Sequence, residues 1–462
     1  MIKPEHLIYT FVSYASHYDT PWGQGVALEG IDRTAAIAHK HGIPVTWIVN
    51  GRSVPVLKER ITEWHRQYGD DVILQSPFFI EDAGASKETF KRALAADWRL
   101  VEEAFPWAKT KIAARGKIYN ELIEALEELD FQGMWGYCWE QVWWDGITHK
   151  GIPWGSWYVD GDRYKVPHPG KGKVVACEWT ARDLNATYHS GCPVIYSTDP
   201  NDVLRAGLCT GDNIDYWKNL FRDYLNNTAH NERVYFLQQQ EAHEMEYTDR
   251  FAVFPASHVE ACAEMLDLFF AHITQFPITL TTLPKAIAGY HEENDATPPV
   301  YMLTEDTLIR PEPNEYTVTL GGTGEGPWPK TFLYYDHECQ MGFVKGQCGP
   351  HRLRSYVGKG SMADEFDERT PQVFVSGYDK TEERIRMSFD IGHWQPMPYG
   401  LTYWDDLSAY EVEGCSEGVE VKIIGDELAF LRFRLTGERM KIELSLVKKQ
   451  AQHMAAIGNR TA

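Results

Sequence analysis

Over the first 290 residues, hydrophobic and polar positions alternate between two kinds of segment. Short apolar runs of strand length are separated by stretches in which apolar residues recur at helical spacing. The strand-like runs cover 7–14, 44–49, 71–76, 111–114, 133–139, 173–179, 233–239 and 278–283. The helix-like stretches cover 30–42, 53–70, 86–105, 118–131, 213–227 and 257–274. This alternation predicts a parallel sheet with crossover helices, and so many strands in under 300 residues favour a distorted parallel (β/α)7-8 barrel over 1–290.

The pattern changes after residue 290. Acidic residues and two adjacent prolines fill the stretch "HEENDATPPV", which predicts a linker over 291–300. From 301 to 450 the chain consists of short alternating strands separated by Gly, Asp and Asn, which predicts an all-β, sandwich-like domain. The last segment, 451–462, is expected to be a flexible tail.

Composition narrows the range of partners. The 462 residues carry a net charge of -21 with no run of Lys and Arg, so neither nucleic acid nor a membrane surface is an expected partner. No apolar run has the length of a membrane span, and no GxGxxG follows the first strand, so no nucleotide cofactor is expected. The eight cysteines are scattered without a CxxC pair, which favours reduced thiols and a cytoplasmic location.

Aromatic residues are in excess and are concentrated in one region. Trp, Tyr and Phe make up 13% of the chain, and Trp is clustered between Trp135 and Trp179. Aromatic faces stack on the apolar faces of sugar rings and line ligand pockets. An oligosaccharide or glycoside is therefore the expected substrate, and a homo-oligomer is compatible with a barrel enzyme of this size.

In parallel barrels the active site lies at the carboxyl ends of the strands, so the polar residues that follow each predicted strand are the site candidates. Candidate catalytic residues are Glu140, Glu178, Asp183 and Glu241. Candidate substrate-binding residues are Trp139, Trp143, Trp144, Trp179, Arg115 and Arg182. Candidate metal ligands are His17, Asp19 and His243.

Two carboxylates that flank a bond are the usual requirement for glycoside hydrolysis, and Glu140 with one of Glu178, Asp183 or Glu241 would meet it. A carboxyl between Trp139 and Trp143 should have a raised pKa and could serve as a general acid. If Arg115 bonds it instead, it could stay ionised and act as a nucleophile. Glu241 and His243 would face one side if the strand continued through them, and a solvated turn is the alternative.

Residues 5–290 resemble the glycoside hydrolase/deacetylase superfamily of (β/α)7 barrels, which includes polysaccharide deacetylases, family-57 glycosidases and zinc α-mannosidases. "GIPVTWIVNG" is similar to the second strand of the deacetylases, and "FPITLTTLPKAIAGY" to their last strand and helix. "SHYDTPW" is similar to the phrase that closes the first strand of the zinc α-mannosidases. That match implies a divalent metal such as zinc, with His17 and Asp19 as ligands and His243 as a third.

The deacetylase metal triad is absent in its usual form. Val12 and Ser13 stand where deacetylases carry paired Asp residues, and "LQSPFFIED" stands where they carry H-x-x-x-H. Glycoside hydrolysis by a carboxylate pair is therefore the first expectation. A metal-dependent carbohydrate deacetylase with a rearranged site is the second, and a non-catalytic sugar-binding protein is the third. Lyase or epimerase chemistry stays open, because Arg115, Arg182 and His243 could hold and deprotonate a uronate.

Overall fold

The computed structural model divides the chain into two units, which we treat separately. The described residues up to Val344 form the first unit, and those from Gln372 onward form the second. The residues that the structure describes are 1–20, 23–76, 85–114, 118–137, 155–161, 163–181, 198–247, 251, 253–298, 300–304, 331–336, 341–344, 372–392, 397–424 and 428–449.

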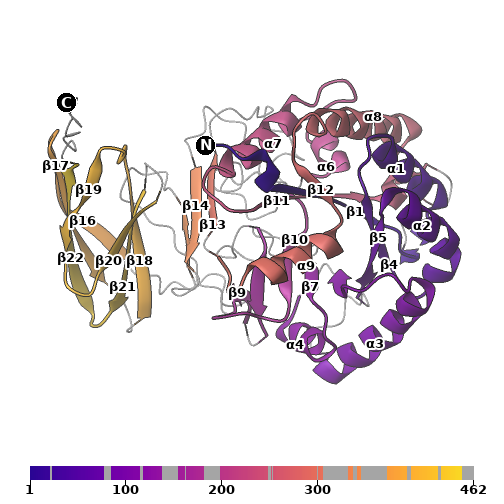
Figure 1. Ribbon diagram of the computed structural model, residues 1–462, viewed down its shortest axis with the longest axis horizontal. Coiled ribbons are helices and arrows are strands. Elements are labelled where there is room, and N and C mark those ends of the chain that lie inside the picture. Colours follow the sequence, from indigo (N-terminus) through magenta and orange to yellow (C-terminus); the bar gives the residue numbers. More distant parts are fainter. Residues whose placement is uncertain are drawn as a thin grey trace, which may run out of the picture. The chain divides into compact units, whose positions relative to one another are not determined.

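The first unit is built on a curled, mostly parallel sheet (Figure 1). Its parallel strands follow the order β11 (Val234–Glu241), β1 (Leu7–Tyr14), β4 (Val45–Val49), β5 (Asp71–Gln75), β6 (Ile112–Ala114), β7 (Gly133–Tyr137) and β10 (Val175–Glu178). The strand β12 (Thr279–Thr281) also pairs with β1 in parallel. Ala181, just after β10, donates its N–H to the carbonyl of Leu237 in β11 at 2.5 Å, so the sheet curls back onto its first strand. The predicted fold class is confirmed.

Short strands complete this unit. The strands β8 (Trp157–Asp160) and β9 (Arg163–Pro167) extend the sheet in antiparallel fashion beyond β10. The strands β2 (Tyr18–Thr20) and β3 (Gly23–Gly25) form a hairpin after β1. A separate antiparallel sheet contains β13 (Val300–Thr304), β14 (Thr331–Asp336) and β15 (Met341–Val344). The expected β domain began at residue 301, whereas these three strands belong to the first unit.

Helices cover the outer face of the curled sheet, except that α9 packs against its inner face at one end (Figure 1). They are η1 (Pro4–His6), α1 (Leu28–Lys40), α2 (Val54–Tyr68), α3 (Lys87–Ala104), α4 (Asn120–Glu128), α6 (Pro200–Arg205), α7 (Asp215–Asn227), η2 (Ala242–Met245), α8 (Ala256–Ile273) and α9 (Leu283–Glu293). The start of α3 is fixed by Ser86, whose side chain accepts the N–H of Thr89, as an N-cap residue should. None of the helices in the described ranges is long and apolar enough to span a membrane.

Two apolar clusters lie on the two faces of the curled sheet. Alternate residues of β1 face opposite sides: Tyr9 and Phe11 pack in the cluster shared with the outer helices, and Val12 packs in the inner one. The inner cluster also contains Leu283 and Ile287 of α9. Since the first residues of α9 bond to the amino ends of β4 and β5, α9 closes that end of the barrel. The carboxyl ends of the strands are left for a site.

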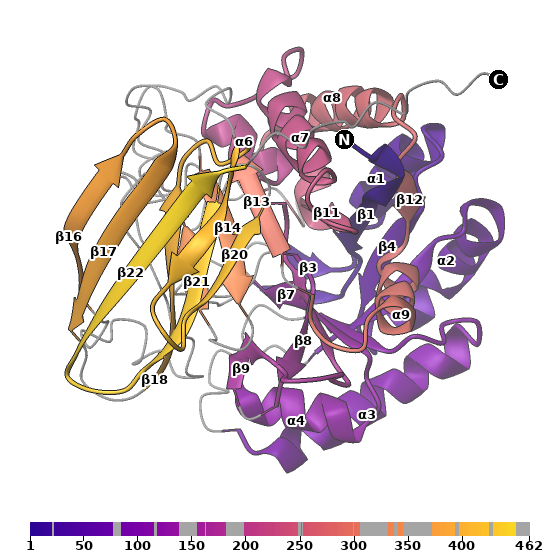
Figure 2. The ribbon, with the colours of Figure 1, turned by 60° about the vertical axis from the view of Figure 1, so that its left-hand side comes forward.

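The second unit consists of two antiparallel sheets (Figure 2). One has the order β16 (Gln372–Lys380), β17 (Arg384–Gly392), β22 (Arg439–Lys448), β19 (Tyr410–Cys415). The other has the order β18 (Met397–Trp404), β21 (Leu428–Leu435), β20 (Glu420–Ile424). Burial alternates along β17, as expected for a strand with one face in a core. The sandwich-like class predicted for this part of the chain is therefore confirmed.

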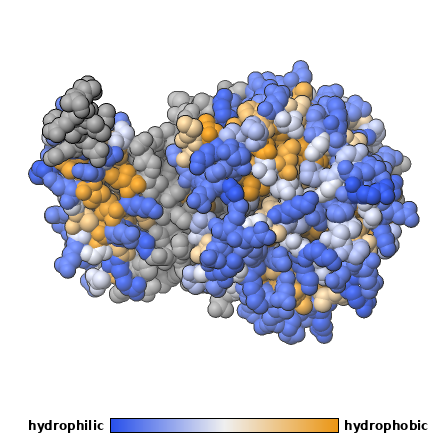
Figure 3. Space-filling view, viewed as in Figure 1, coloured by the Kyte–Doolittle hydropathy of each residue, from blue (hydrophilic) through white to orange (hydrophobic). Residues whose placement is uncertain are grey.

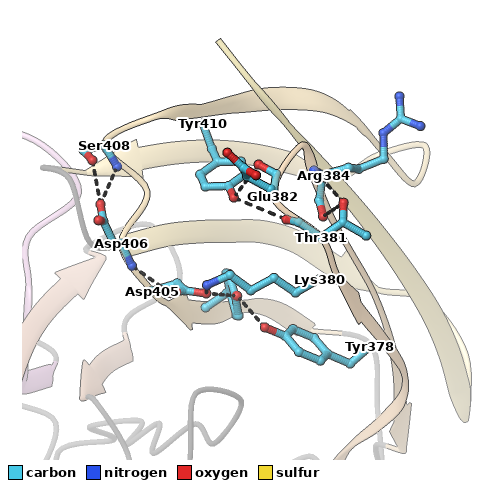
Figure 4. A network of polar contacts seen from close by, with 10 residues as sticks. Tyr378, Lys380, Thr381, Glu382, Arg384, Asp405, Asp406, Ser408 and Tyr410 are labelled. Atoms are coloured by element: carbon cyan, nitrogen blue, oxygen red, sulfur yellow. Dashed lines mark hydrogen bonds and ion pairs between the residues drawn. The ribbon is translucent and has the colours of Figure 1, made fainter.

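A polar network joins the two sheets of the second unit (Figure 4). The hydroxyls of Tyr378 in β16 and Tyr403 in β18 lie 3.0 Å apart, and Tyr403 donates to Asp405 at 2.5 Å. Lys380 also donates to Asp405, at 2.6 Å. These hydrogen bonds connect β16 of one sheet with the end of β18 in the other.

Hydrophobic residues also reach the surface of this unit (Figure 3), and Val375 and Val412 are exposed.

Candidate functional site

The candidate site begins at the carboxyl end of β11. This strand pairs in parallel with β1 over its whole length, and the register places Glu241 opposite Tyr14. The strand ends at Glu241, and the chain continues directly into the 3-10 turn η2. The polar side chains of this segment are therefore held beside the end of β1, at the carboxyl ends of the strands.

Three side chains of this segment converge. Glu241, His243 and Glu244 each offer one ligand atom, and these atoms all lie within 4.8 Å of one another. His243 is 3% exposed, and its Nδ1 lies 3.2 Å from Glu241 Oε2 but has no hydrogen-bond partner in the described part of the chain. Burial lowers the pKa of His243 to about 4, so the imidazole is neutral at pH 7. A neutral imidazole between two carboxyl groups is a donor set that suits a divalent metal ion.

Further acidic groups surround Glu244. Burial raises the pKa of Glu244 well above its usual range, and the charges of Glu241, Asp199 and Asp202 raise it further. Arg205 acts in the opposite direction and pairs with Asp202. Burial also raises the pKa of Asp199. A nearby cation would favour the ionised forms of these carboxyl groups, because it would offset their mutual repulsion.

The position of η2 depends on α1. A Cβ on Gly30 would lie 1.9 Å from the carbonyl oxygen of Ala242, so only glycine lets the helix approach the turn this closely. The N–H of Gly30 donates to Glu246 at 3.4 Å, and Arg33 donates to the carbonyl of Met245. The backbone of the turn that carries His243 and Glu244 is therefore held by direct contact with α1.

At the end of β1, His17 and Asp19 face a protein cation. Arg52 donates to Asp19, and its Nη2 lies 3.1 Å from His17 Nε2. Asn50 donates to the carbonyl of His17 at 3.1 Å and to Gln75 at 3.2 Å. The side chain between them, Tyr18, packs against His243 with ring centroids 4.5 Å apart. Among the described residues, the group that could hold a metal contains His243 but neither His17 nor Asp19.

Of the other predicted site residues, the structure describes Glu178 and Trp179. Glu178 is 2% exposed, and its Oε1 accepts the N–H of Gly155 at 2.6 Å. Trp179 is buried in the inner cluster. The other predicted residues lie outside the described part of the chain, and they are Arg115, Trp139, Glu140, Trp143, Trp144, Arg182 and Asp183.

The structure adds residues that the sequence analysis did not select. Glu244 completes the three-residue group, and Asp199, Asn201 and Asp202 come from α6. The stretch "TDPND" does carry a signal, since an Asp before Pro is typical of a helix start. Asp199 indeed caps α6 by accepting the N–H of Asp202. A cap signal does not show that the same helix start lies beside the end of β11.

Comparison with known proteins gives structural matches only. No protein-family model and no curated protein sequence matches the chain. A putative polysaccharide deacetylase from Mycobacterium smegmatis matches with 14% identity and a TM-score of 0.41, over 67% of this chain and 96% of that one. A 4-alpha-glucanotransferase from Thermococcus litoralis matches with 8% identity and a TM-score of 0.40, over 96% of this chain and 100% of that one.

A third match is a CE4 family pseudoenzyme from Bacillus anthracis, with 12% identity and a TM-score of 0.32, over 62% of this chain and 66% of that one. All three matches have low sequence identity, and the likeness concerns the fold alone.

Proposed function

We propose that the chain is a carbohydrate-active hydrolase that removes acyl groups with the help of a divalent metal ion held by Glu241, His243 and Glu244. The observation that carries the proposal is the convergence of these three ligand atoms within 4.8 Å at the carboxyl end of β11. The sequence resemblance to sugar hydrolases supports the substrate class.

The donor set fits such an ion. Two carboxylates and one neutral imidazole are suitable ligands for zinc, and the low pKa of His243 leaves one of its ring nitrogens unprotonated for coordination. When bound, a metal of this kind supplies a Lewis acid and an activated water. The ion would also lower the repulsion among the carboxyl groups around Glu244, which are otherwise forced toward their neutral forms.

Tyr18 is the group suited to stabilise charge on the substrate. Its hydroxyl is buried, has no hydrogen-bond partner among the described residues, and belongs to a ring that packs against His243. Burial raises the pKa of Tyr18, and the nearby Glu241 adds to the rise, so the hydroxyl stays protonated. A protonated hydroxyl beside the ligand group could donate to the oxyanion that forms when water attacks an acyl carbon.

A second candidate is glycoside hydrolysis without a metal, the first expectation from the sequence. It is favoured by the raised pKa of Glu244 beside Glu241, because such a pair can supply a general acid and a second carboxylate. The two candidates exclude one another at these residues, since a carboxylate that coordinates a metal no longer carries a proton to donate.

The test combines metal analysis with two assays. The purified protein is loaded with Zn²⁺, dialysed, and assayed for acetate release from acetylated sugars and for cleavage of chromogenic glycosides. We expect bound zinc, chelator-sensitive acetate release, and loss of both in His243→Ala. His41→Ala is the matched control, because the imidazole of His41 pairs with Asp267 and is not part of the ligand group. Chelator-resistant cleavage of glycosides that Glu244→Gln abolishes would establish the second candidate and refute the first.

A further inference from the structure

We infer that Asn201 is the positioning residue that orients Glu244 toward the metal, and that α8 in turn fixes the orientation of Asn201. The inference rests on the proposed metal site. Asn201 lies in α6 and is 1% exposed. Its Nδ2 donates to Glu244 Oε2, while its Oδ1 faces His258 Nε2 at 2.9 Å and Cys262 Sγ at 3.3 Å.

These partners select one orientation of the amide. Cys262 has a thiol that donates, and His258 can donate from Nε2, so the oxygen of Asn201 is the atom that should face both. The amide nitrogen is then directed at Glu244. An ionised Glu244 can accept this hydrogen bond but would be repelled by an amide oxygen in the same place. The orientation seen is therefore the one that a metal-ligating carboxylate requires.

The helix start that carries Asn201 is attached to the strand that carries the ligands. Asp199 accepts the N–H of Asp202 at 2.9 Å through Oδ1 and the side-chain amide of Gln239 at 2.8 Å through Oδ2. Gln239 lies two residues before Glu241 in β11. A single carboxylate thus links α6 to β11, and Asn201 is set two residues beyond that link.

The hydrogen bond from Asn201 affects the orientation of the Glu244 carboxyl group. Its Oε2 accepts the Asn201 amide, and this hydrogen bond restricts the rotation of the carboxyl group that contributes to the ligand group. Hydrogen bonds that orient a metal-ligating carboxylate commonly change metal affinity by about 10- to 100-fold. Asn201 is not expected to touch the substrate, because its polar atoms are already bonded within the protein.

The test measures Zn²⁺ affinity by competition with a chromophoric chelator at pH 7, on folded protein checked by circular dichroism. Asn201→Leu keeps the size of the side chain and removes the donor, and we expect about 10- to 100-fold weaker zinc binding. His258→Phe removes a partner of the amide oxygen without touching Asn201, and we expect a smaller loss in the same direction. His272→Phe, on the same helix but packed against Phe221 and Phe276, is the matched control with unchanged affinity.

The outcomes separate the inference from the proposed function. Wild-type protein that binds zinc, together with unchanged affinity in folded Asn201→Leu or in His258→Phe, would overturn the positioning role alone. Wild-type protein that binds no zinc would overturn the proposed metal site and this inference with it. If Asn201→Leu does not fold, His258→Phe decides the question, since it leaves the residue itself in place.

Discussion

The carboxyl of Asp71 offers a quantitative test of the closed end of the barrel. Asp71 begins β5, where its Oδ1 accepts the N–H of Val72 at 2.9 Å and its Oδ2 lies 3.4 Å from the Thr282 hydroxyl that precedes α9. Burial raises the pKa of Asp71 from 3.8 to about 6, and these hydrogen bonds only partly oppose the rise. At neutral pH the folded protein therefore holds a charge that its surroundings disfavour.

The sign and size of the effect of Asp71 on the free energy of unfolding follow from the linkage between proton binding and folding. Since the folded-state pKa lies above the unfolded one, the protonated form favours folding, and the stability that it contributes is lost as pH rises from 3.8 through about 6. At about 1.4 kcal/mol per pKa unit, ionisation costs about 3 kcal/mol at pH 7.5 and about 1 kcal/mol at pH 4.5. Asp71→Asn keeps the acceptor for Val72 and removes the charge, so it should raise the free energy of unfolding by those amounts.

The assay is urea unfolding followed by Trp fluorescence at pH 4.5 and pH 7.5, comparing variant with wild type. Asp32→Asn is the control, because Asp32 is an exposed carboxylate of α1 paired with Arg60, and surface pairs contribute about 0–1 kcal/mol at either pH. A stabilisation of Asp71→Asn that does not grow between pH 4.5 and pH 7.5 would refute the reasoning. So would a variant that is less stable than wild type at pH 7.5.

Three further substitutions test contacts elsewhere. Gly30→Ala should displace η2, because the added Cβ would lie 1.9 Å from the carbonyl oxygen of Ala242. Zinc titration should then show weaker binding than in the wild type. Unchanged zinc affinity would contradict the importance of this contact. Tyr403→Phe removes the hydroxyl that joins Tyr378 and Asp405, and should cost the second unit about 1–2 kcal/mol in urea unfolding. An unchanged midpoint would show that the network adds no stability. Ser86→Ala removes the cap of α3 and should lower stability by about 1 kcal/mol, whereas an unchanged Tm would mean that water replaces the cap.

The sheet could be predicted from the sequence because its strands are buried on both faces. Such strands appear as continuous apolar runs, and the run 7–14 coincides with β1. The strands β8 and β9 were not predicted, since they are short and lie after a loop rather than between two helices. The sequence also does not show that β13–β15 belong to the first unit, because alternation of polar and apolar residues identifies a strand without identifying the strands beside it.

Of the candidate ligand group, Glu241 and His243 could be selected from the sequence, but strand alternation is not what brings them together. Strand alternation would have placed Glu241 and His243 on one side, but β11 ends at Glu241 and a 3-10 turn follows. In such a turn, residues three apart lie on the same side, which brings Glu244 next to Glu241. Asn201 and His258 could not be predicted, because they are 43 and 57 residues from their partners in the chain and no local pattern marks the contact.

The two halves of the expected metal site differ in how their charge is neutralised. At the end of β1, Arg52 already supplies a cation to Asp19, and its guanidinium also faces the Nε2 of His17 that a metal would need. At the end of β11, burial and the charge of Glu241 raise the pKa of Glu244, and Arg205 is engaged with Asp202. An added cation gains more where carboxylates outnumber protein cations than where an arginine is already paired. The metal predicted from "SHYDTPW" is therefore better placed in the turn after β11, with His243 as the ligand common to both assignments.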